Sequence, residues 1–255
     1  MTAIIRGGLL LAVALLVTVS VFAHTQNDDP ARTIVERAVA AHGGDAWLRP
    51  GTLILSGEAV FYSPDSAEPR SRADDYRMWR VMDPDRTSSH GADGKVRIHA
   101  QTGGETMFEV GYDGETTWTE QGVMPKAEAD AYWASSFGFG IIRSALRDGF
   151  TLESAPPRSV DGHAIDLVRV IAPDGQTTLF GFDRDSGFIR YMGFGSPRGW
   201  HERHYDDFIR LPGTGWVQAT TVTLFYDGIR SNTVYWRGVK VGEPIPDTVF
   251  KHRGD

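Results

Sequence analysis

Short runs of apolar and aromatic residues, separated by turn-forming residues, fill the chain from Leu53 onward. A strand with one buried face alternates apolar and polar residues, but here the alternation repeatedly fails. Because helical segments are too few to cover two apolar faces, the pattern predicts a curved sheet. Helices would cover part of one side and leave an apolar hollow for a ligand. In Gly215–Tyr226, Trp216, Val222, Leu224 and Tyr226 oppose Val217, Ala219 and Phe225; in Phe188–Gly195, Phe188, Met192 and Phe194 oppose Ile189 and Tyr191.

The residues before the first strand predict an amphipathic helix. Asp29 can cap it, Pro30 suits its first turn and Gly43 ends it. His42 falls in the last turn, where a partly protonated imidazole would suit the helix dipole, and we prefer this capping role to one as a ligand or base. Trp47 is predicted to anchor the helix to the sheet. The apolar stripe of the helix consists of Ile34, Val35, Ala38 and Val39.

Five strands are predicted to follow this helix. Asp113-Gly114 predicts a hairpin between the last two of them, since an Asp-Gly pair between apolar runs is a strong turn signal. The five strands are Thr52–Tyr62, Asp74–Met82, Lys95–Gln101, Glu105–Tyr112 and Thr116–Glu120.

After Pro125 the pattern becomes helical. Trp133, Phe137 and Ile141 recur every four residues, and Gly138 and Gly140 interrupt the segment. Two short helices hinged at the glycines are therefore expected, over Lys126–Phe137 and Gly140–Arg147.

Strands resume at Phe150 and continue to Val241, with hairpins at Asp174-Gly175 and Asp185–Gly187. A total of roughly a dozen strands joined by short loops favours an antiparallel meander. Full closure of such a sheet would leave no edges, whereas partial closure leaves a mouth.

The N-terminal residues resemble an export signal. Arg6 supplies a positive charge, Leu9–Phe22 is apolar or small throughout, and Val21–Ala23 fits a cleavage site. The run is short for a membrane span, which needs about 20 apolar residues. We expect a cleavable signal peptide over 1–23, a single domain over 24–255 and a periplasmic protein; the alternative is an uncleaved N-terminal anchor.

Composition narrows the class of partner. The chain contains no cysteine, so it is neither a disulfide scaffold nor itself acylated at a lipobox cysteine. Its net charge of −7 argues against binding to nucleic acid and against tight binding to anionic lipid head groups.

Candidate enzyme motifs are weak. His201–His204 falls one residue short of the zinc motif H-E-x-x-H, and in a strand these two histidines point to opposite faces, so the cluster is interpreted as a solvated edge. No serine lies in a G-x-S-x-G motif, and no phosphate-binding or dinucleotide-binding loop is present. We therefore expect no catalytic residue, metal or cofactor. One metal alternative stays open: cleavage after Ala23 would leave His24 as the N-terminus, which can bind copper with a second histidine.

Several local stretches are similar to the LolA/LolB-like superfamily of periplasmic lipoprotein carriers. They are Ile34–Ala38 before His42–Gly44, Tyr112–Gly114 before Trp118, Leu179–Asp183 before Gly187–Ile189, Tyr205–Phe208 with Gly213 and Trp216, and the ending Ile245–Phe250. The resemblance covers most of the chain after the leader. It implies a mainly β (α+β) fold, an open, incompletely closed antiparallel β-barrel with an N-terminal helix and a central helical lid over an apolar cavity.

The resemblance also implies that acyl chains enter the cavity. The founding carriers have a basic residue before a proline in an early strand, tied to lid control, whereas here Asp83 precedes Pro84. A divergent relative that binds or senses another lipid therefore fits equally well. Candidate lid residues are Trp133, Phe137, Ile141 and Ile142. Candidate cavity residues are Trp79, Phe108, Phe180, Phe182, Met192, Phe194, Leu224 and Trp236.

The sequence thus predicts an exported monomer that binds a lipid or the acyl chains of a lipoprotein, without covalent chemistry, for carriage across the periplasm. Its expected partners are that ligand and a membrane-bound donor or receptor protein. The first alternative is an envelope sensor that recognises lipid and signals to a protein partner. A secreted hydrolase and a copper-binding protein are weaker alternatives.

Overall fold

The computed structural model describes residues 29–64 and 66–252, and within them thirteen antiparallel strands form one sheet. The helices are α1 (Pro30–His42), α2 (Asp45–Leu48) and α3 (Lys126–Ser136), with 3₁₀ helices η1 (Phe139–Arg143) and η2 (Asp247–Val249). The strands are β1 (Thr52–Tyr62), β2 (Pro69–Val81), β3 (Lys95–Thr102), β4 (Glu105–Tyr112), β5 (Thr117–Thr119), β6 (Gly122–Val123), β7 (Thr151–Val160), β8 (His163–Ile171), β9 (Thr177–Asp183), β10 (Ile189–Ser196), β11 (Gly199–Arg210), β12 (Val217–Tyr226) and β13 (Ile229–Val241).

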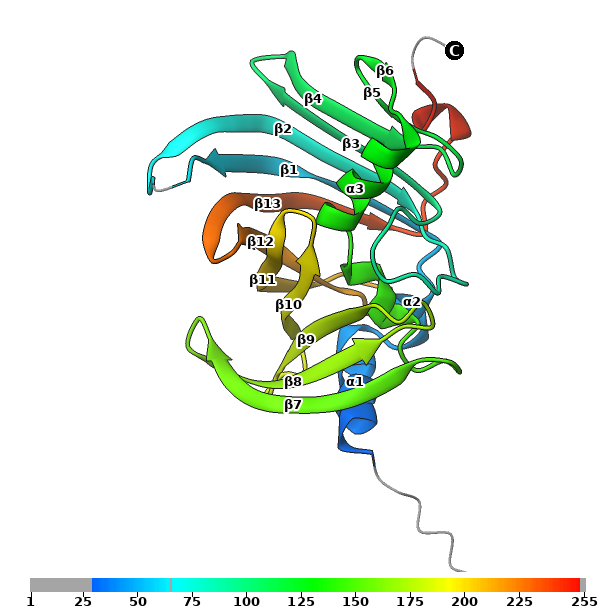
Figure 1. Cartoon of the computed structure of the whole chain (residues 1–255), viewed down its shortest axis with the longest axis vertical. Coiled ribbons are helices and arrows are strands. Elements are labelled where there is room, and N and C mark those ends of the chain that lie inside the picture. The colour runs from blue at the N-terminus through cyan, green and yellow to red at the C-terminus, as the bar shows by residue number, and fades with distance from the viewer. Residues whose placement is uncertain (1–28, 65, 253–255) are drawn as a thin grey trace, which may run out of the picture.

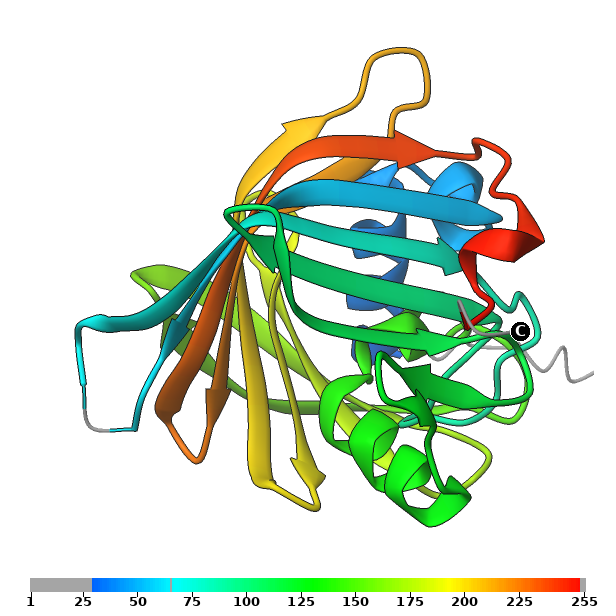
Figure 2. The same ribbon diagram turned by 90° about the horizontal axis from the view of Figure 1, so that it is seen from above.

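The strand order is β6-β5-β4-β3-β2-β1-β13-β12-β11-β10-β9-β8-β7. The chain runs outward from β1 to one edge, β6, and then from the other edge, β7, back to β13, which pairs with β1. The two edges do not pair, so the sheet curls into an unclosed barrel around α1 (Figures 1 and 2). This confirms the predicted mainly β, open antiparallel architecture with an N-terminal helix.

Residues 124–150 join the two unpaired edges and contain α3 and η1. We call this segment the helical connection. It follows the prediction in outline, but its second helix is the short 3₁₀ helix η1 rather than a helix over Gly140–Arg147. Phe137 is extended (φ −121°, ψ 116°) and ends α3, which breaks the expected four-residue spacing.

The predicted caps of α1 are confirmed. The Asp29 carboxylate accepts a hydrogen bond from the backbone N–H of Ala31 at 3.0 Å, and Pro30 opens the helix. Gly43, at φ 125°, ends it in a conformation that only glycine adopts readily. The helix contacts β7, β8 and β12, so it bridges distant strands of the curled sheet.

His42 has a different role from the predicted one. Its imidazole is buried, its Nε2 accepts a hydrogen bond from the backbone N–H of Ile189 at 3.0 Å, and its Nδ1 lies 3.5 Å from the carbonyl oxygen of Val217. Burial lowers the pKa of His42 to about 4, so the expected partly protonated imidazole is wrong. A neutral His42 instead joins the end of α1 to the starts of β10 and β12, while Trp47 stacks on its ring and is buried as predicted.

The failed alternation in the two stretches singled out above has a local cause. Asp207 interrupts the ladder between β11 and β12 with a φ of 52°, and its backbone and side-chain oxygens accept hydrogen bonds from the hydroxyls of Thr220 and Thr221. As a result, Ala219 and Val222 both face the inside of the sheet. A second irregularity, between Ile189 and Tyr191, does the same in β10. The assignment to two faces is therefore wrong for Ile189, Val217 and Ala219, which face inward, because a backbone irregularity changes which face the following residues occupy. It holds for Tyr191, which lies apart from the main core that contains Met192 and Phe194.

Part of the outer face is nevertheless apolar. A small buried cluster separate from the main core consists of Val160, Ile165, Leu167 and Tyr191, with Ala155 and Leu179 packed against it. The main core lies inside the curl, between the sheet, α1 and the helical connection.

The predicted signal peptide and His24 lie outside the described residues. Among the residues that are described, no helix has the length and apolar character needed to cross a membrane.

Candidate functional site

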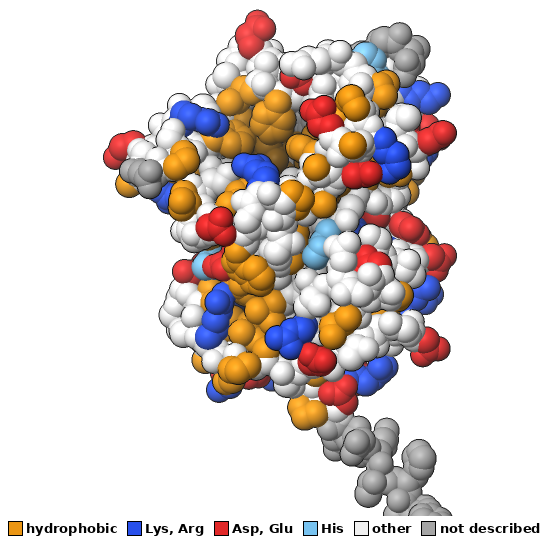
Figure 3. Space-filling model, viewed as in Figure 1, with side chains coloured by type: hydrophobic (Ala, Val, Ile, Leu, Met, Phe, Trp, Pro, Cys, Tyr) orange, Lys and Arg blue, Asp and Glu red, His pale blue; other side chains and the backbone are white. Residues whose placement is uncertain are grey.

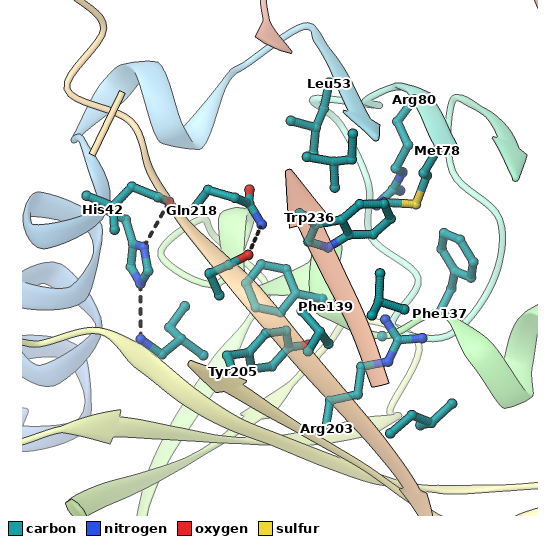
Figure 4. A pocket seen from close by; sticks show the side chains of 18 of the residues that line it. His42, Leu53, Met78, Arg80, Phe137, Phe139, Arg203, Tyr205, Gln218 and Trp236 are labelled. Carbon is teal, nitrogen blue, oxygen red and sulfur yellow. Dashed lines mark hydrogen bonds between the residues drawn. The ribbon is translucent and has the colours of Figure 1, made fainter. Parts of the chain in front are cut away.

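A cavity of about 160 Å³ lies inside the curled sheet (Figure 4). Apolar side chains from β1, β2, β3, β12 and β13 form its strand wall: Leu53, Leu55, Met78, Ile98, Val217, Ala219, Val222, Leu224, Val234 and Trp236. In Figure 3, the face that carries α3 is hollowed beside this helix, and hydrophobic side chains line the hollow. Such a space suits an apolar ligand, since burying each methylene contributes about 0.8 kcal/mol.

The helical connection forms another wall of the cavity. Phe137, Gly138, Phe139 and Arg143 all line it. Gly138 packs directly on Phe194: a Cβ at this glycine would lie 2.6 Å from Cε1 of the phenyl ring, so no larger residue fits without movement. The connection therefore closes the cavity as well as linking the two sheet edges.

Two carbonyl groups at the end of α3 accept side-chain hydrogen bonds from the sheet. The Ser135 oxygen accepts from the Tyr226 hydroxyl at 2.7 Å and lies 2.8 Å from His201 Nδ1. The Ser136 oxygen accepts from Arg203 Nη2 at 2.7 Å. Helix-terminal carbonyls lack partners within their own helix, so these side chains satisfy groups that would otherwise need water. We call these three contacts the α3 latch.

A buried ion cluster lies at one end of the cavity. The Asp93 carboxylate pairs with Arg80 and, at 2.6 Å, with Arg86, and all three side chains are buried. Arg86 also donates to the carbonyls of Ser88 and Ser89, both at 2.7 Å. Two guanidinium groups thus share a single carboxylate, which holds the pKa of Asp93 below its usual range despite its burial.

Two further arginines reach the cavity without a carboxylate. Arg143 donates from Nε to the Trp47 carbonyl at 2.9 Å, and its guanidinium lies over the Trp47 ring at 4.6 Å. Arg203 donates from Nε to His201 Nε2 at 3.1 Å. Among the described residues, no salt bridge includes either arginine, although the cavity lining contains both.

Burial sets the charge states of the other titratable side chains here. It lowers the pKa of His201 to about 2 and raises those of Tyr76 and Tyr205 to about 12. At neutral pH the imidazole is therefore uncharged and both phenols keep their protons. The cavity can bind an apolar molecule and offer it positive charge and hydroxyl groups.

The structure brings only part of the predicted ligand site to the cavity. Leu224 and Trp236 line it. Phe180, Phe182, Met192 and Phe194 are on the inner face but fully buried in the main core. Phe108 is half-buried beside Tyr76, at 6.3 Å between ring centroids, and Trp79 lies outside the cavity lining with Arg97 over its ring. Strand alternation explains Trp79, because its neighbours Met78 and Arg80 are the ones that face inward.

Of the predicted lid residues, Phe137 lines the cavity, whereas Trp133, Ile141 and Ile142 are buried in the core. The residues that sequence reasoning missed are Phe139, Arg143 and Arg203. The 3₁₀ turn after Gly138 places Phe139 and Arg143 in the lining. Arg203 lies two residues before Tyr205 on β11, so strand alternation could have placed both side chains on the inner face.

The histidine motif is divided between the two faces of β11. His201 is fully buried and takes part in the α3 latch. His204 lies on the other face, 2.7 Å from both Asp161 and Glu202. The predicted divergence of the two rings is confirmed. The interpretation as a solvated edge is wrong, because β11 lies between β10 and β12 within the sheet.

Comparison with known proteins identifies the fold. No protein-family model matches the sequence, and no curated protein matches it. A solved domain from Vibrio parahaemolyticus, assigned to outer membrane lipoprotein sorting, has 12% identity and a TM-score of 0.54, with 87% of this chain and 96% of that one covered. A LolA superfamily protein from Nitrosomonas europaea has 14% identity and the same TM-score of 0.54, with coverages of 87% and 97%. The chain therefore has a divergent LolA-like fold.

Proposed function

We propose that this LolA-like chain binds a lipid, or the acyl chains of a lipoprotein, in its apolar cavity and carries it across the periplasm. The observation that supports this best is the position of the cavity. It lies between the strand wall and the helical connection, which joins the two free edges of the sheet and pairs with neither. Binding needs no covalent chemistry.

Binding of a long acyl chain would require the helical connection to move, because the cavity is small. At about 160 Å³ it is close to a cavity of about 150 Å³ that holds benzene, and smaller than the roughly 300–1,000 Å³ of typical ligand pockets. A long acyl chain therefore requires the wall to open. The α3 latch and the packing of Gly138 on Phe194 hold that wall in place. Because the helical connection contains no strand of the sheet, its opening would not break any strand pairing.

The expected affinity suits a carrier. Burying about ten methylenes contributes at most about 8 kcal/mol, which corresponds to a dissociation constant in the micromolar range. Such a ligand is retained during transit but still leaves when a better acceptor is available.

Native mass spectrometry of the protein purified gently from its own envelope tests this proposal, with organic extraction of whatever accompanies it. A stoichiometric lipid or acylated peptide is the expected result. An empty protein that also fails to take up a neutral apolar fluorophore would contradict the lipid-binding proposal. N-terminal sequencing of the same sample tests cleavage after Ala23.

A further inference from the structure

The cavity and its surroundings carry an excess of positive charge that the protein itself does not neutralise. Arg80, Arg143 and Arg203 line the cavity, and Arg86 lies behind Arg80. Among the described residues, Asp93 is the one carboxylate that pairs with any of the four. An uncompensated charge next to apolar walls is costly, because such walls cannot replace the lost hydration.

Arg143 is placed to receive an anion. Its guanidinium is surrounded by the rings of Trp47, Trp216 and Phe139 at 4.6, 5.4 and 5.5 Å. These rings stabilise the cation but accept no conventional hydrogen bond. Within the described part of the chain, only its Nε donates a hydrogen bond, so both terminal nitrogens are available.

Arg203 reaches the same region from β11. Both its charge and that of Arg143 act on the pKa of Tyr205, whose ring lies 5.0 Å from that of Phe139. Figure 4 shows the Arg203 side chain extending toward Phe137 beside Tyr205. The positive charges therefore gather around Tyr205 and Phe139, while the strand wall opposite them is apolar.

The third arginine is also incompletely satisfied. Arg80 is buried, and its Nε is a buried nitrogen without a hydrogen-bond partner among the described residues. Burial and the nearby charge of Arg80 lower the pKa of Arg143 to about 9, which leaves Arg143 charged at neutral pH. Arg143 thus contributes a positive charge to the cavity under physiological conditions.

We propose that the ligand of this cavity is an anionic amphiphile, whose carboxylate or phosphate is bound by Arg143 and Arg203 and whose apolar chain lies along β1, β12 and β13. The inference rests on the proposed lipid-binding function and specifies the chemical class of its ligand. A guanidinium is well suited to this role, because its planar donors match the oxygens of a carboxylate or phosphate.

Four probes with the same twelve-carbon chain test this inference: dodecanoate, dodecyl phosphate, dodecanol and dodecyltrimethylammonium. Each is titrated against the exported protein, stripped of bound lipid and loaded with the neutral fluorophore N-phenyl-1-naphthylamine. At least one anion is expected to displace the fluorophore at about tenfold lower concentration than dodecanol, the low end of the effect of a charged hydrogen bond. The order of the two anions shows whether carboxylate or phosphate is preferred.

Variants assign the preference to the two arginines. Arg203→Gln and Arg143→Gln are expected to remove most of the anion preference, measured in each variant as the ratio of its affinity for the anion to its affinity for dodecanol, whereas Arg203→Lys and Arg143→Lys retain part of it. Arg237→Gln is the matched control, since this arginine is 69% exposed and pairs with Glu58 outside the cavity. If a glutamine variant does not fold, the wild-type probe series still tests the anion preference, and the lysine variants still test whether the two arginines cause it.

Two negative outcomes differ in meaning. If dodecanol or the ammonium compound displaces the fluorophore as well as both anions do, the anion inference is wrong and the lipid-binding proposal stands. If neither the fluorophore nor any of the four probes binds, the proposed function fails and this inference fails with it.

Discussion

The guanidinium of Arg203, on β11, donates a 2.7 Å hydrogen bond to the backbone oxygen of Ser136, in the last turn of α3. The same arginine lines the cavity. One side chain therefore contacts both the segment that closes the cavity and the space that a ligand would occupy. A ligand anion that binds Arg203 would compete with Ser136 for its donors, which would couple ligand binding to release of α3.

Tyr226→Phe tests the α3 latch. The substitution removes the hydroxyl that donates to the Ser135 oxygen at 2.7 Å and leaves the ring in place. A hydrogen bond of this kind contributes about 1 kcal/mol, so amides of α3 are expected to exchange about fivefold faster with deuterium. Tyr235→Phe is the control, since Tyr235 is on β13 outside the cavity lining. Unchanged exchange in the Tyr226 variant would show that the latch does not hold α3.

Gly138→Ala tests the packing of the helical connection on the sheet. The added Cβ would lie 2.6 Å from the Phe194 ring, and overpacking of a core usually costs about 1–3 kcal/mol, so a lower melting temperature is expected. Gly195→Ala is the matched control on β10, because a Cβ there meets nothing within 4 Å. Adding Phe194→Leu to the Gly138 variant should recover part of the loss. Equal melting temperatures for the two alanine variants would contradict the tight contact.

The local elements of this fold could be predicted because their signals are local. Asp29, Pro30 and Gly43 delimit α1 by capping chemistry that involves only neighbouring residues. Asp113-Gly114 likewise specified the turn between β4 and β5. The pairing of β1 with β13 depends on contacts between the two ends of the chain, and no residue pattern along the sequence encodes it. The family resemblance implied an incompletely closed barrel, but not that its free edges would be β6 and β7.

The cavity lining was harder to predict, for two physical reasons. The irregularity at Asp207 changes which face of β11 and β12 is inward although the register of the two strands stays the same, and it leaves no reliable mark in the apolar pattern. The net charge of the chain gives no guide to the charge inside the cavity. A net charge of −7 describes the whole chain, whereas the positive charges of Arg143 and Arg203 are held inside it. Composition cannot distinguish a cation on the surface from one facing a cavity.

His42 predicts a pH dependence of folding stability. Its pKa is lowered from 6.5 to about 4 in the folded state, so the unfolded chain binds the proton more readily between these values. The free energy of unfolding should therefore be fully retained above about pH 6.5 and fall as the pH drops toward 4, by about 3 kcal/mol in total from this group.

Chemical denaturation of the wild type and His42→Asn between pH 5 and 7 measures this contribution. The variant is less stable at pH 7, because it loses the buried imidazole, but its stability should depend less on pH. His201 and the carboxylates titrate in both proteins, so only the difference between the two curves reports on His42. Parallel curves would contradict the buried, neutral imidazole.

Ala219→Leu tests whether the cavity is the binding site. Ala219 is buried on β12 and lines the cavity, so a larger side chain fills part of its roughly 160 Å³. Filling a cavity with apolar atoms usually maintains or raises stability, whereas it removes space from a ligand. Binding of N-phenyl-1-naphthylamine should therefore weaken by about tenfold, as expected when a ligand loses about 1.4 kcal/mol of contacts, without a lower melting temperature. Ala131→Leu makes the same change at an exposed position on α3 and should leave binding unaffected. If the Ala219 variant kept its stability and still bound the fluorophore with wild-type affinity, the ligand would have to bind elsewhere, since a filled cavity cannot hold it.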